Sequence, residues 1–322
     1  MGEVKRILIT GAGGFIGRAC VAVARARGIE VVAVVRRTVP AEWSRDAGIA
    51  LVTADLSDPA SVAVLAQALQ GCGAAIHAAA HLGGDAEKIA ADTLSGTRHL
   101  LAALPEGLRL VLVSSIVVYD TMSVAPGAVL DERSALAAPG HAPDAYAEAK
   151  LAQEALARAA GHPLWLIRPG AVWGPGRTWH ALNGVDAGPL HITLTSDGVL
   201  PIVHVTQLAK ALIAAALTDP GGIRALNAVD DDLPTRSRYV AAHRRATGRP
   251  KLSMALPWTV WLGLAKLLRP LAPRLPGLLR EPVLRARIMP LRWPNTALRA
   301  ALGGNDAAGY EQMLERSTRG AE

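Results

Sequence analysis

Two side chains that can do proton chemistry, Tyr146 and Lys150, lie four residues apart in the segment 144–150, DAYAEAK. The composition of this segment predicts a helix, and residues four apart lie on one helical face. An ammonium held beside a phenol favours the phenolate, so we expect Lys150 to lower the pKa of Tyr146 toward working pH. Such a pair suits general acid–base catalysis, although the same spacing also occurs in ordinary exposed Tyr/Lys pairs.

A cluster of glycines lies directly after the first apolar run. Residues 7–10, ILIT, predict a strand, and a helix-forming stretch begins at once after the glycines. Gly11 allows the sharp turn, Gly14 the close approach of a pyrophosphate, and Gly17 tight packing of the helix on the sheet. The helix start offers free N–H groups to phosphates. A glycine triplet alone also fits a plain turn, but strand, turn and helix together predict a dinucleotide site.

The end of the second predicted strand, 30–35, indicates which dinucleotide the site prefers. Val35 holds the position where NAD-specific sites carry Asp or Glu, and Arg36 and Arg37 follow it. A carboxylate would repel a 2′-phosphate, whereas a guanidinium can bind one through paired N–H donors. The sequence therefore favours NADP(H) over NAD(H), with a solvated pair of surface arginines as the alternative.

Two later strand ends complete the predicted cofactor site. Asp55 and Leu56 follow the third strand, where the carboxylate can accept from the adenine amino group and the leucine can flank the ring. Helix capping is the other role of Asp55, and the two are compatible. After the fourth strand, Ala78 and Ala79 allow the backbone to lie against the cofactor. We interpret His77 as a structural histidine.

Ser115 follows a fifth predicted strand, and the Tyr146/Lys150 segment comes after it. With these features in this order, the chain resembles the extended branch of the short-chain dehydrogenase/reductase superfamily, which is epimerase/dehydratase-like. The resemblance rests on TGAGGFIG (10–17), SSIVVY (114–119), YAEAK (146–150) and LIRPGAVWGPG (166–176), with landmarks in 202–209 and 226–228. In character the chain is most similar to steroid-dehydrogenase-like and ketoceramide-type keto-lipid reductases.

This resemblance implies a role for each catalytic candidate. Tyr146 would be the general acid/base, Lys150 would hold the nicotinamide ribose and tune Tyr146, and Ser115 would hydrogen-bond the reacting oxygen. Together the predictions place the cofactor against Gly11, Gly13, Gly14, Phe15, Ile16, Gly17, Arg36, Arg37, Asp55, Leu56, Ala78, Ala79, Tyr146, Lys150, Pro169 and Val172. No metal site is expected.

The expected fold is α/β, a Rossmann-type doubly wound parallel sheet with a smaller, mostly helical C-terminal substrate lobe. Residues 1–176 form the dinucleotide-binding domain, to which 200–230 return. Residues 177–199 and 231–322 form the lobe.

Departures from the branch bear on the substrate. Thr93 stands where the branch often has Asn, Ala171 replaces the Asn common in nucleotide-sugar enzymes, and Thr206-Gln207 replaces a late Asp. We therefore expect an NADP(H)-dependent oxidoreductase that reduces a ketone, or oxidises the matching alcohol, on a large apolar, lipid-like substrate. A 3-keto sphingolipid, a ceramide or a sterol would fit. A nucleotide-sugar epimerase or dehydratase is one alternative, and a non-catalytic dinucleotide-binding scaffold is another.

Composition narrows the setting of the protein. The 322 residues are 51% hydrophobic, with two cysteines and a formal net charge of +7. The start of the chain does not resemble a signal peptide, and no uncharged apolar run reaches the ~18 residues of a membrane span. These features predict a cytoplasmic protein in a reducing compartment. The oligomeric state stays open, and a dimer is compatible with the sequence.

The distal third is basic. Residues 251–292 carry eight basic side chains and one acid, Glu281, and no nucleic-acid-binding motif is found, so no nucleic-acid partner is expected. Apolar residues at helical spacing form one face of a predicted helix: Trp258, Trp261, Leu262, Ala265 and Leu268. A basic helix with tryptophans suggests peripheral contact with the inner face of the membrane. Ordinary packing of this helix on the lobe is the alternative.

Overall fold

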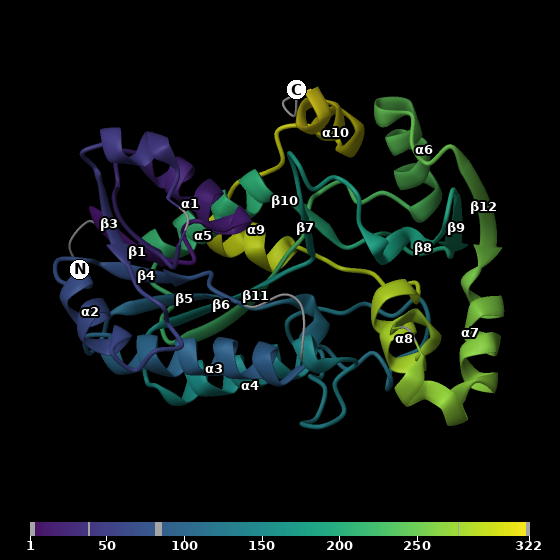
Figure 1. The fold of residues 1–322 in the computed structure, drawn as a ribbon, viewed down its shortest axis with the longest axis horizontal. Coiled ribbons are helices and arrows are strands. Elements are labelled where there is room, and N and C mark those ends of the chain that lie inside the picture. Colours follow the sequence, from purple (N-terminus) through teal and green to yellow (C-terminus); the bar gives the residue numbers. More distant parts are fainter. Residues whose placement is uncertain (1–3, 38, 81–85, 276, 320–322) are drawn as a thin grey trace.

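Seven parallel strands form the centre of the molecule (Figure 1), in a computed structural model that describes residues 4–37, 39–80, 86–275 and 277–319. The strands are β1 (Arg6–Thr10), β2 (Glu30–Val35), β3 (Ile49–Thr53), β4 (Ala74–His77), β5 (Arg109–Val113), β6 (Leu164–Pro169) and β11 (Ile223–Ala228). Their order is β11-β6-β5-β4-β1-β2-β3, and every pairing is parallel. The order reverses between β1 and β4, and such a switch point is where open α/β sheets bind ligands.

Both faces of this sheet are apolar because helices cover both. Ile7 and Ile9 pack toward α1 and α5, whereas Leu8 between them packs toward α2 and α3. The helices are α1 (Phe15–Ala26), α2 (Ser61–Ala68), α3 (Ala86–Ala103), α4 (Ala145–Ala159) and α5 (Val205–Leu217). Figure 1 shows α3 and α4 along one face and α1 and α5 along the other. The predicted doubly wound α/β fold is confirmed.

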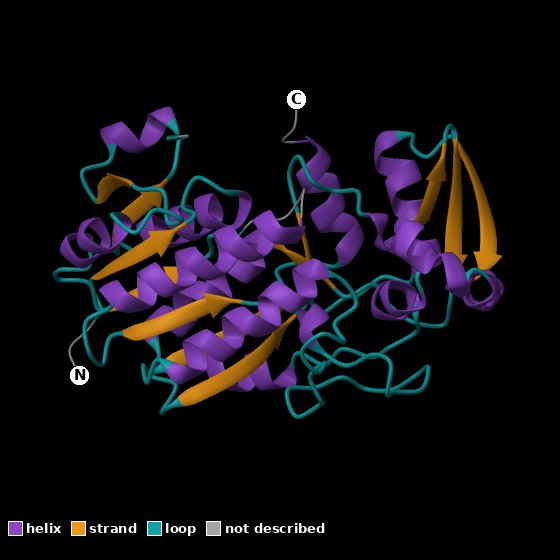
Figure 2. Ribbon diagram, turned by 60° about the horizontal axis from the view of Figure 1, so that its bottom comes forward, coloured by secondary structure: helices purple, strands orange, loops and turns teal. Residues whose placement is uncertain are grey.

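Beyond the sheet, the chain forms a second, smaller region that is more than a set of helices (Figure 2). Its helices are α6 (Arg236–Thr247), α7 (Trp258–Leu267), α8 (Glu281–Ile288) and α10 (Tyr310–Arg319). They pack with a three-stranded sheet that the sequence did not indicate. The antiparallel pair β8 (Gly184–Ala187) and β9 (Leu190–Thr195) is extended by β12 (Leu252–Pro257) parallel to β9. A further pair, β7 (Ala171–Trp173) and β10 (Ile202–His204), links the two regions.

One helix in the range predicted for the lobe packs on the sheet instead. Helix α9 (Thr296–Leu302) contacts β11 and α5, and its Leu298 lies in the same apolar cluster as Ile7. Within 231–322, therefore, the short helix α9 belongs with the sheet, whereas α10, which follows it, packs on α6 of the lobe.

The tryptophan face of α7 points into the protein, which corrects the expectation that it is a membrane-facing surface. Trp258 and Ala265 are buried, and Trp261 and Leu262 are partly buried against the same cluster. The indole nitrogen of Trp261 donates to the carbonyl of Leu278 at 2.8 Å. These bulky side chains pack inside the lobe rather than facing a membrane, because they fill the space beside α8. Among the described residues, none of the helices is both long enough and apolar enough to cross a bilayer.

Candidate functional site

The carboxyl ends of β1 and β4 meet at the switch point, and glycine is required there. Gly11 has φ +66°, and a Cβ at this position would lie 2.8 Å from the Cα of Ala79 and 3.0 Å from the carbonyl carbon of Ala78. Behind the turn, a Cβ on Gly17 would collide with the backbone of Gly11 and Ala12. The glycines thus have the packing roles that the sequence predicts for Gly11 and Gly17.

Gly14 is the N-cap of α1 and has no side chain to occupy the N–H groups of the first turn. Those groups therefore have no side-chain cap and, with the helix dipole, favour an anion. No acidic residue lies in the first turn. The start of α1 fits a pyrophosphate in both geometry and charge.

A cleft of about 370 Å³ opens at this point. Its lining includes nine of the residues predicted for the cofactor: Gly11, Gly13, Gly14, Arg36, Arg37, Asp55, Leu56, Ala78 and Ala79. It also includes residues that sequence reasoning missed or did not assign: Val34, Val35, Ala54, Ser57, His77, Ala80, Asp92, Thr93 and Gly96. Phe15, Ile16, Gly17, Pro169 and Val172, like the three catalytic candidates, lie outside this lining.

The side chains at the far end of the cleft carry opposite charges. Arg36 and Arg37 are exposed, and no hydrogen bond or ion pair engages either guanidinium within the described ranges. Asp55 accepts from the backbone and hydroxyl of Ser57 at 3.0 and 2.7 Å, and these bonds hold the pKa of its carboxyl low. Asp55 does not cap α2, whose N-cap is Ala60. The arginines are therefore free to bind a phosphate.

Tyr146 lies near the start of α4 and Ser115 directly after β5, so both occupy the carboxyl edge of the sheet. Burial raises the pKa of Tyr146 to about 12, although the nearby Ser115 hydroxyl lowers it in part. Burial outweighs the other influences on this phenol, and Lys150 is not among them, so the expectation that Lys150 lowers this pKa is wrong. The Nζ atom of Lys150 is 6.0 Å from the centre of the Tyr146 ring and is held by other partners.

Those partners are the carbonyl of Val113, at 2.7 Å, and the side-chain oxygen of Gln153, at 2.8 Å. An ammonium has three N–H donors, so two of those of Lys150 are engaged and one remains. Burial lowers the pKa of Lys150 to about 8, because no carboxylate contacts it directly and Glu154 compensates only in part. Gln153 was not predicted as a site residue.

A chain of buried hydrogen bonds fixes the orientation of Gln153. Its amide nitrogen donates to Thr97 Oγ1 at 2.8 Å, and that hydroxyl donates its own proton to the carbonyl of Thr93. His77 Nε2, 3.0 Å from the same oxygen, must therefore donate. His77 Nδ1 then accepts from the Thr10 hydroxyl at 2.7 Å. Burial lowers the pKa of His77 to about 3, so the ring stays neutral and the chain keeps one direction.

A second buried network joins the strands beneath the catalytic residues. Arg168 binds Glu154 through two hydrogen bonds of 2.9 and 2.7 Å, and the Ser114 hydroxyl donates to the same carboxylate at 2.6 Å. Tyr119 accepts from Arg168 and donates to Asn227 at 2.7 Å. Burial alone would raise the pKa of Glu154, but Arg168 holds it below its usual range. The network fixes β5, α4, β6 and β11 relative to one another.

The lobe is tied to the catalytic helix by one ion pair. Asp144 caps α4 by accepting from the backbone of Ala147, and its other oxygen binds Arg287 of α8 at 2.9 Å. The negative charge of Asp144 adds to the effect of burial in raising the pKa of Tyr146. Through the ion pair of Arg287 with Asp144, a movement of α8 would displace the residue that caps α4.

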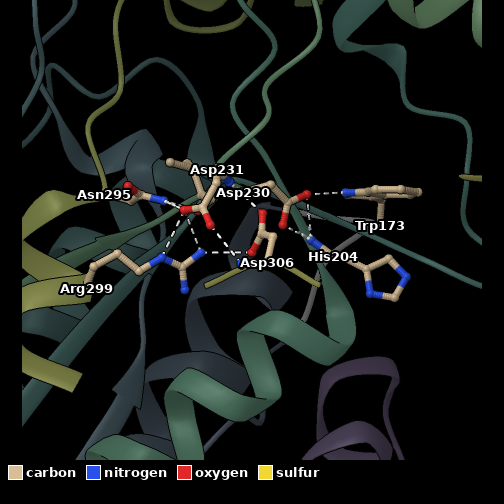
Figure 3. Close-up of polar contacts among 8 residues, drawn as sticks. Trp173, His204, Asp230, Asp231, Asn295, Arg299 and Asp306 are labelled. Carbon is tan, nitrogen blue, oxygen red and sulfur yellow. Dashed lines mark hydrogen bonds and ion pairs between the residues drawn. The ribbon is translucent and has the colours of Figure 1, made fainter. Parts of the chain in front are cut away.

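A cluster of acids holds β7 and β10 to the end of β11 (Figure 3). Asp230 accepts from the indole of Trp173 at 2.8 Å and from the backbone of His204 at 2.8 Å. Burial raises its pKa to about 7. Next to it, Arg299 of α9 bridges Asp231 and Asp306, both at 2.8 Å. The cluster supports the segment that contains Val172.

The chain is similar in sequence to a family of dinucleotide-dependent enzymes. The model of the NAD dependent epimerase/dehydratase family matches residues 7–225. The chain is 28% identical to a ceramide reductase of Caulobacter vibrioides over 78% of its own length and 73% of the relative's. It is 31% identical to a 3-diazoavenalumate denitrifying reductase of a Streptomyces species, over 76% and 82%.

Solved structures share the fold at lower identity. UDP-glucose 4-epimerase from Bifidobacterium longum, in complex with NAD⁺ and UDP, superposes with a TM-score of 0.69 at 19% identity and 97% coverage of both chains. At this identity the similarity concerns the fold alone. The cleft at the switch point, with its glycine turn and uncapped helix start, fits an NAD(P) cofactor.

Proposed function

Since this chain belongs to the NAD dependent epimerase/dehydratase family, we propose that it is an NADP(H)-dependent oxidoreductase which reduces a ketone on a large apolar, lipid-like substrate. The observation that carries the proposal is the placement of Ser115, Tyr146 and Lys150 together at the carboxyl edge of the sheet. A 3-keto sphingolipid, a ceramide or a sterol is the substrate class that fits best.

Tyr146 is the proton donor in this proposal. A phenol with a pKa of about 12 is protonated at neutral pH, as a general acid in ketone reduction must be. Ser115 donates a hydrogen bond to the same carbonyl oxygen, where negative charge grows as the carbon is reduced. Bound NADPH supplies the hydride. The products are the alcohol and NADP⁺, and Tyr146 regains its proton from solvent.

Lys150 holds the nicotinamide ribose through its remaining N–H donor. Pro169 is the last residue of β6, and Val172 lies within β7. In this proposal both residues border the nicotinamide half of the cofactor, whereas Arg36 and Arg37 border its adenosine half. Arg36 and Arg37 favour NADPH, because both are unengaged and no carboxylate ends β2.

The apolar character of the substrate is supported from two sides. The residue after Ser115, Ile116, belongs to an apolar cluster that extends into the lobe through Trp258, Met289 and Trp293. The Caulobacter relative is a ceramide reductase, and Ala171 lacks the amide that nucleotide-sugar enzymes commonly carry.

A substrate screen tests the proposal. Oxidation of NADPH would be followed at 340 nm, the absorbance band of the reduced nicotinamide, with 3-keto lipids, keto-steroids and nucleotide sugars offered separately. We expect turnover with an apolar ketone. Conversion of a UDP-sugar to its epimer, detected by product analysis with no net change in this absorbance, would instead establish an epimerase with a tightly held, regenerated cofactor. Cofactor binding with no turnover of any substrate class would support a scaffold.

A further inference from the structure

The segment 252–271, which contains β12 and α7, exposes an unusual amount of apolar surface. Of the fourteen large apolar side chains exposed among the described residues, six lie within 252–271. We call these six the outer patch: Leu252, Met254, Val260, Leu264, Leu267 and Leu271. Leu267 is 77% exposed, and Leu252 and Val260 are more than half exposed. Five of them lie on β12 and α7, and Leu271 lies in the short helix Arg269–Arg274 that follows; this gathering in one stretch of chain separates them from scattered surface leucines, which need no explanation.

Helix α7 is apolar on two opposite faces. Val260, Leu264 and Leu267 follow the i, i+4, i+7 spacing of one stripe, while Trp258 and Ala265 face the core. A helix that is apolar all round is ordinarily covered on every side. Within the described residues, no other element covers the outer stripe of α7.

The segment that carries the outer patch is basic. Lys251, Lys266, Arg269 and Arg274 are exposed, and none of them forms an ion pair within the part of the chain that the structure describes. Residues 233–280 contain neither Asp nor Glu. An apolar stripe with unpaired basic side chains in the same segment is complementary to a surface that is apolar inside and anionic outside.

We propose that the outer patch docks on an anionic lipid membrane, with α7 lying in the plane of the interface. At 10 residues α7 is about 15 Å long and cannot span a bilayer, so it lies along the surface. A second copy of this chain fits less well, because a symmetric interface would bring this basic segment against its own equivalent. The proposal stands on the surface itself and does not depend on which ketone the enzyme reduces.

Vesicle co-sedimentation of the full-length protein tests it. Vesicles of equal parts phosphatidylglycerol and phosphatidylcholine would be compared with pure phosphatidylcholine, at low and high salt. We expect binding to the anionic vesicles that falls several-fold at high salt. Leu264→Asp/Leu267→Asp should lower the partition coefficient at least about tenfold, because charges replace the most exposed part of the stripe. Lys266→Glu/Arg269→Glu should abolish the difference between the two vesicle types.

Val64→Asp/Leu217→Asp is the matched control, since both residues are exposed to a similar degree as Leu264 but lie away from α7. It should bind as the wild type does. Thermal unfolding of each variant reports whether it is folded. Wild-type protein that stays in the supernatant with anionic vesicles overturns the proposal. So does a dimer in sedimentation velocity that Leu264→Asp/Leu267→Asp converts to a monomer while vesicle binding is absent.

Discussion

Two fully buried arginines, one in each region, are held in different ways. Arg168, beneath the catalytic residues, forms a bidentate ion pair with Glu154, which raises the pKa of the Arg168 guanidinium. Arg236, in the lobe, donates only to neutral oxygens, including those of Leu182 and Ser196, and burial lowers its pKa to about 10. The buried arginine beneath the site is thus held by a paired charge, whereas the one in the lobe is held by neutral oxygens; the ion pairs of the lobe, such as those of Arg238 with Asp232 and Glu311, lie nearer its surface.

Buried side-chain atoms without a hydrogen-bond partner occur in both regions of the described chain, among them the Ser61 hydroxyl and Arg109 Nε on the sheet side. Near Lys150, the side chains of Gln153, Thr97 and His77 are joined in one directed chain. In the lobe, the amide of Asn183 and His191 Nε2 are buried and have no hydrogen-bond partner within the described part of the chain. The directed chain beside Lys150 is what fixes the position of its ammonium at the catalytic edge.

The largest expected effect lies at the catalytic edge. Tyr146→Phe should lower kcat by roughly 10²–10⁴, because the proton donor is removed while the ring stays in place. Cofactor affinity, measured by fluorescence titration, should change little. Ordinary turnover by this variant would show that this edge is not where the chemistry occurs.

Removal of each buried arginine tests the comparison directly. Arg168→Met should lower the free energy of unfolding by about 3 kcal/mol, because it leaves the buried Glu154 carboxylate with only the Ser114 hydroxyl and the half-exposed Arg158, 3.6 Å away. Arg236→Met should cost less than about 2 kcal/mol, since it removes a costly charge and leaves only neutral acceptors. Urea unfolding of both variants would measure the difference. Equal losses would mean that the two arginines do not differ in this way.

Cofactor preference should change at the end of β2. Arg36→Ala should erase most of a preference for NADPH over NADH that we expect to be at least tenfold, or about 1.4 kcal/mol. Titration of both dinucleotides into both proteins measures it, with the lobe variant Arg245→Ala as a control for lost surface charge. A wild type that prefers NADH would exclude the proposed role of Arg36.

The pH profile tests the positioning of Lys150 by Gln153. With a Lys150 pKa of about 8, kcat/KM should fall as pH rises past that value and the ammonium loses its proton. Gln153→Leu removes an acceptor from the ammonium, so the fall should move to lower pH. Gln153→Glu should move it to higher pH. Identical profiles in all three proteins would mean that Gln153 has only a structural role.

The smallest effect is expected at Asp230, where the two regions meet. Its pKa of about 7 lies above the ordinary 3.8, so the folded protein keeps this proton after the unfolded chain has lost it. The stabilising contribution is complete below pH ~4 and is lost as pH rises through ~7. Asp230→Asn should therefore flatten the decline of the melting temperature over this range. An unchanged decline would assign it to other groups, such as Asp306.

The sequence predicts the catalytic edge of the sheet better than it predicts the lobe. The turn at Gly11, the helix start at Gly14 and the strand-end positions of Arg36 and Asp55 could all be predicted, because local geometry requires particular residue types there. The partners of Lys150 could not, since the chain from Gln153 through Thr97 to His77 joins residues far apart in sequence. Without these hydrogen bonds, the spacing of Tyr146 and Lys150 predicts that the ammonium lowers the pKa of the phenol. In the structure, burial raises that pKa instead.

In the lobe, periodicity was ambiguous. Helix α7 is apolar on two faces, so spacing leaves both membrane contact and packing on the lobe open for the tryptophan face, and it is this face that packs into the protein. The hairpin of β8 and β9 turns at Gly188, which has a positive φ, but its short mixed strands resemble a loop in sequence. Pairing with β12, more than 50 residues later, is a tertiary contact that no local pattern indicates.

The most direct test of the proposed reaction follows the hydride itself. NADPH deuterated at C4 of the nicotinamide, on whichever face is transferred, would be incubated with the enzyme and a 3-keto lipid, and the product analysed by mass spectrometry. We expect an alcohol that carries one deuterium on the carbon bearing the hydroxyl, and loss of this product with Tyr146→Phe. Unlabelled product formed while the cofactor stays reduced on the enzyme would contradict ketone reduction by this site.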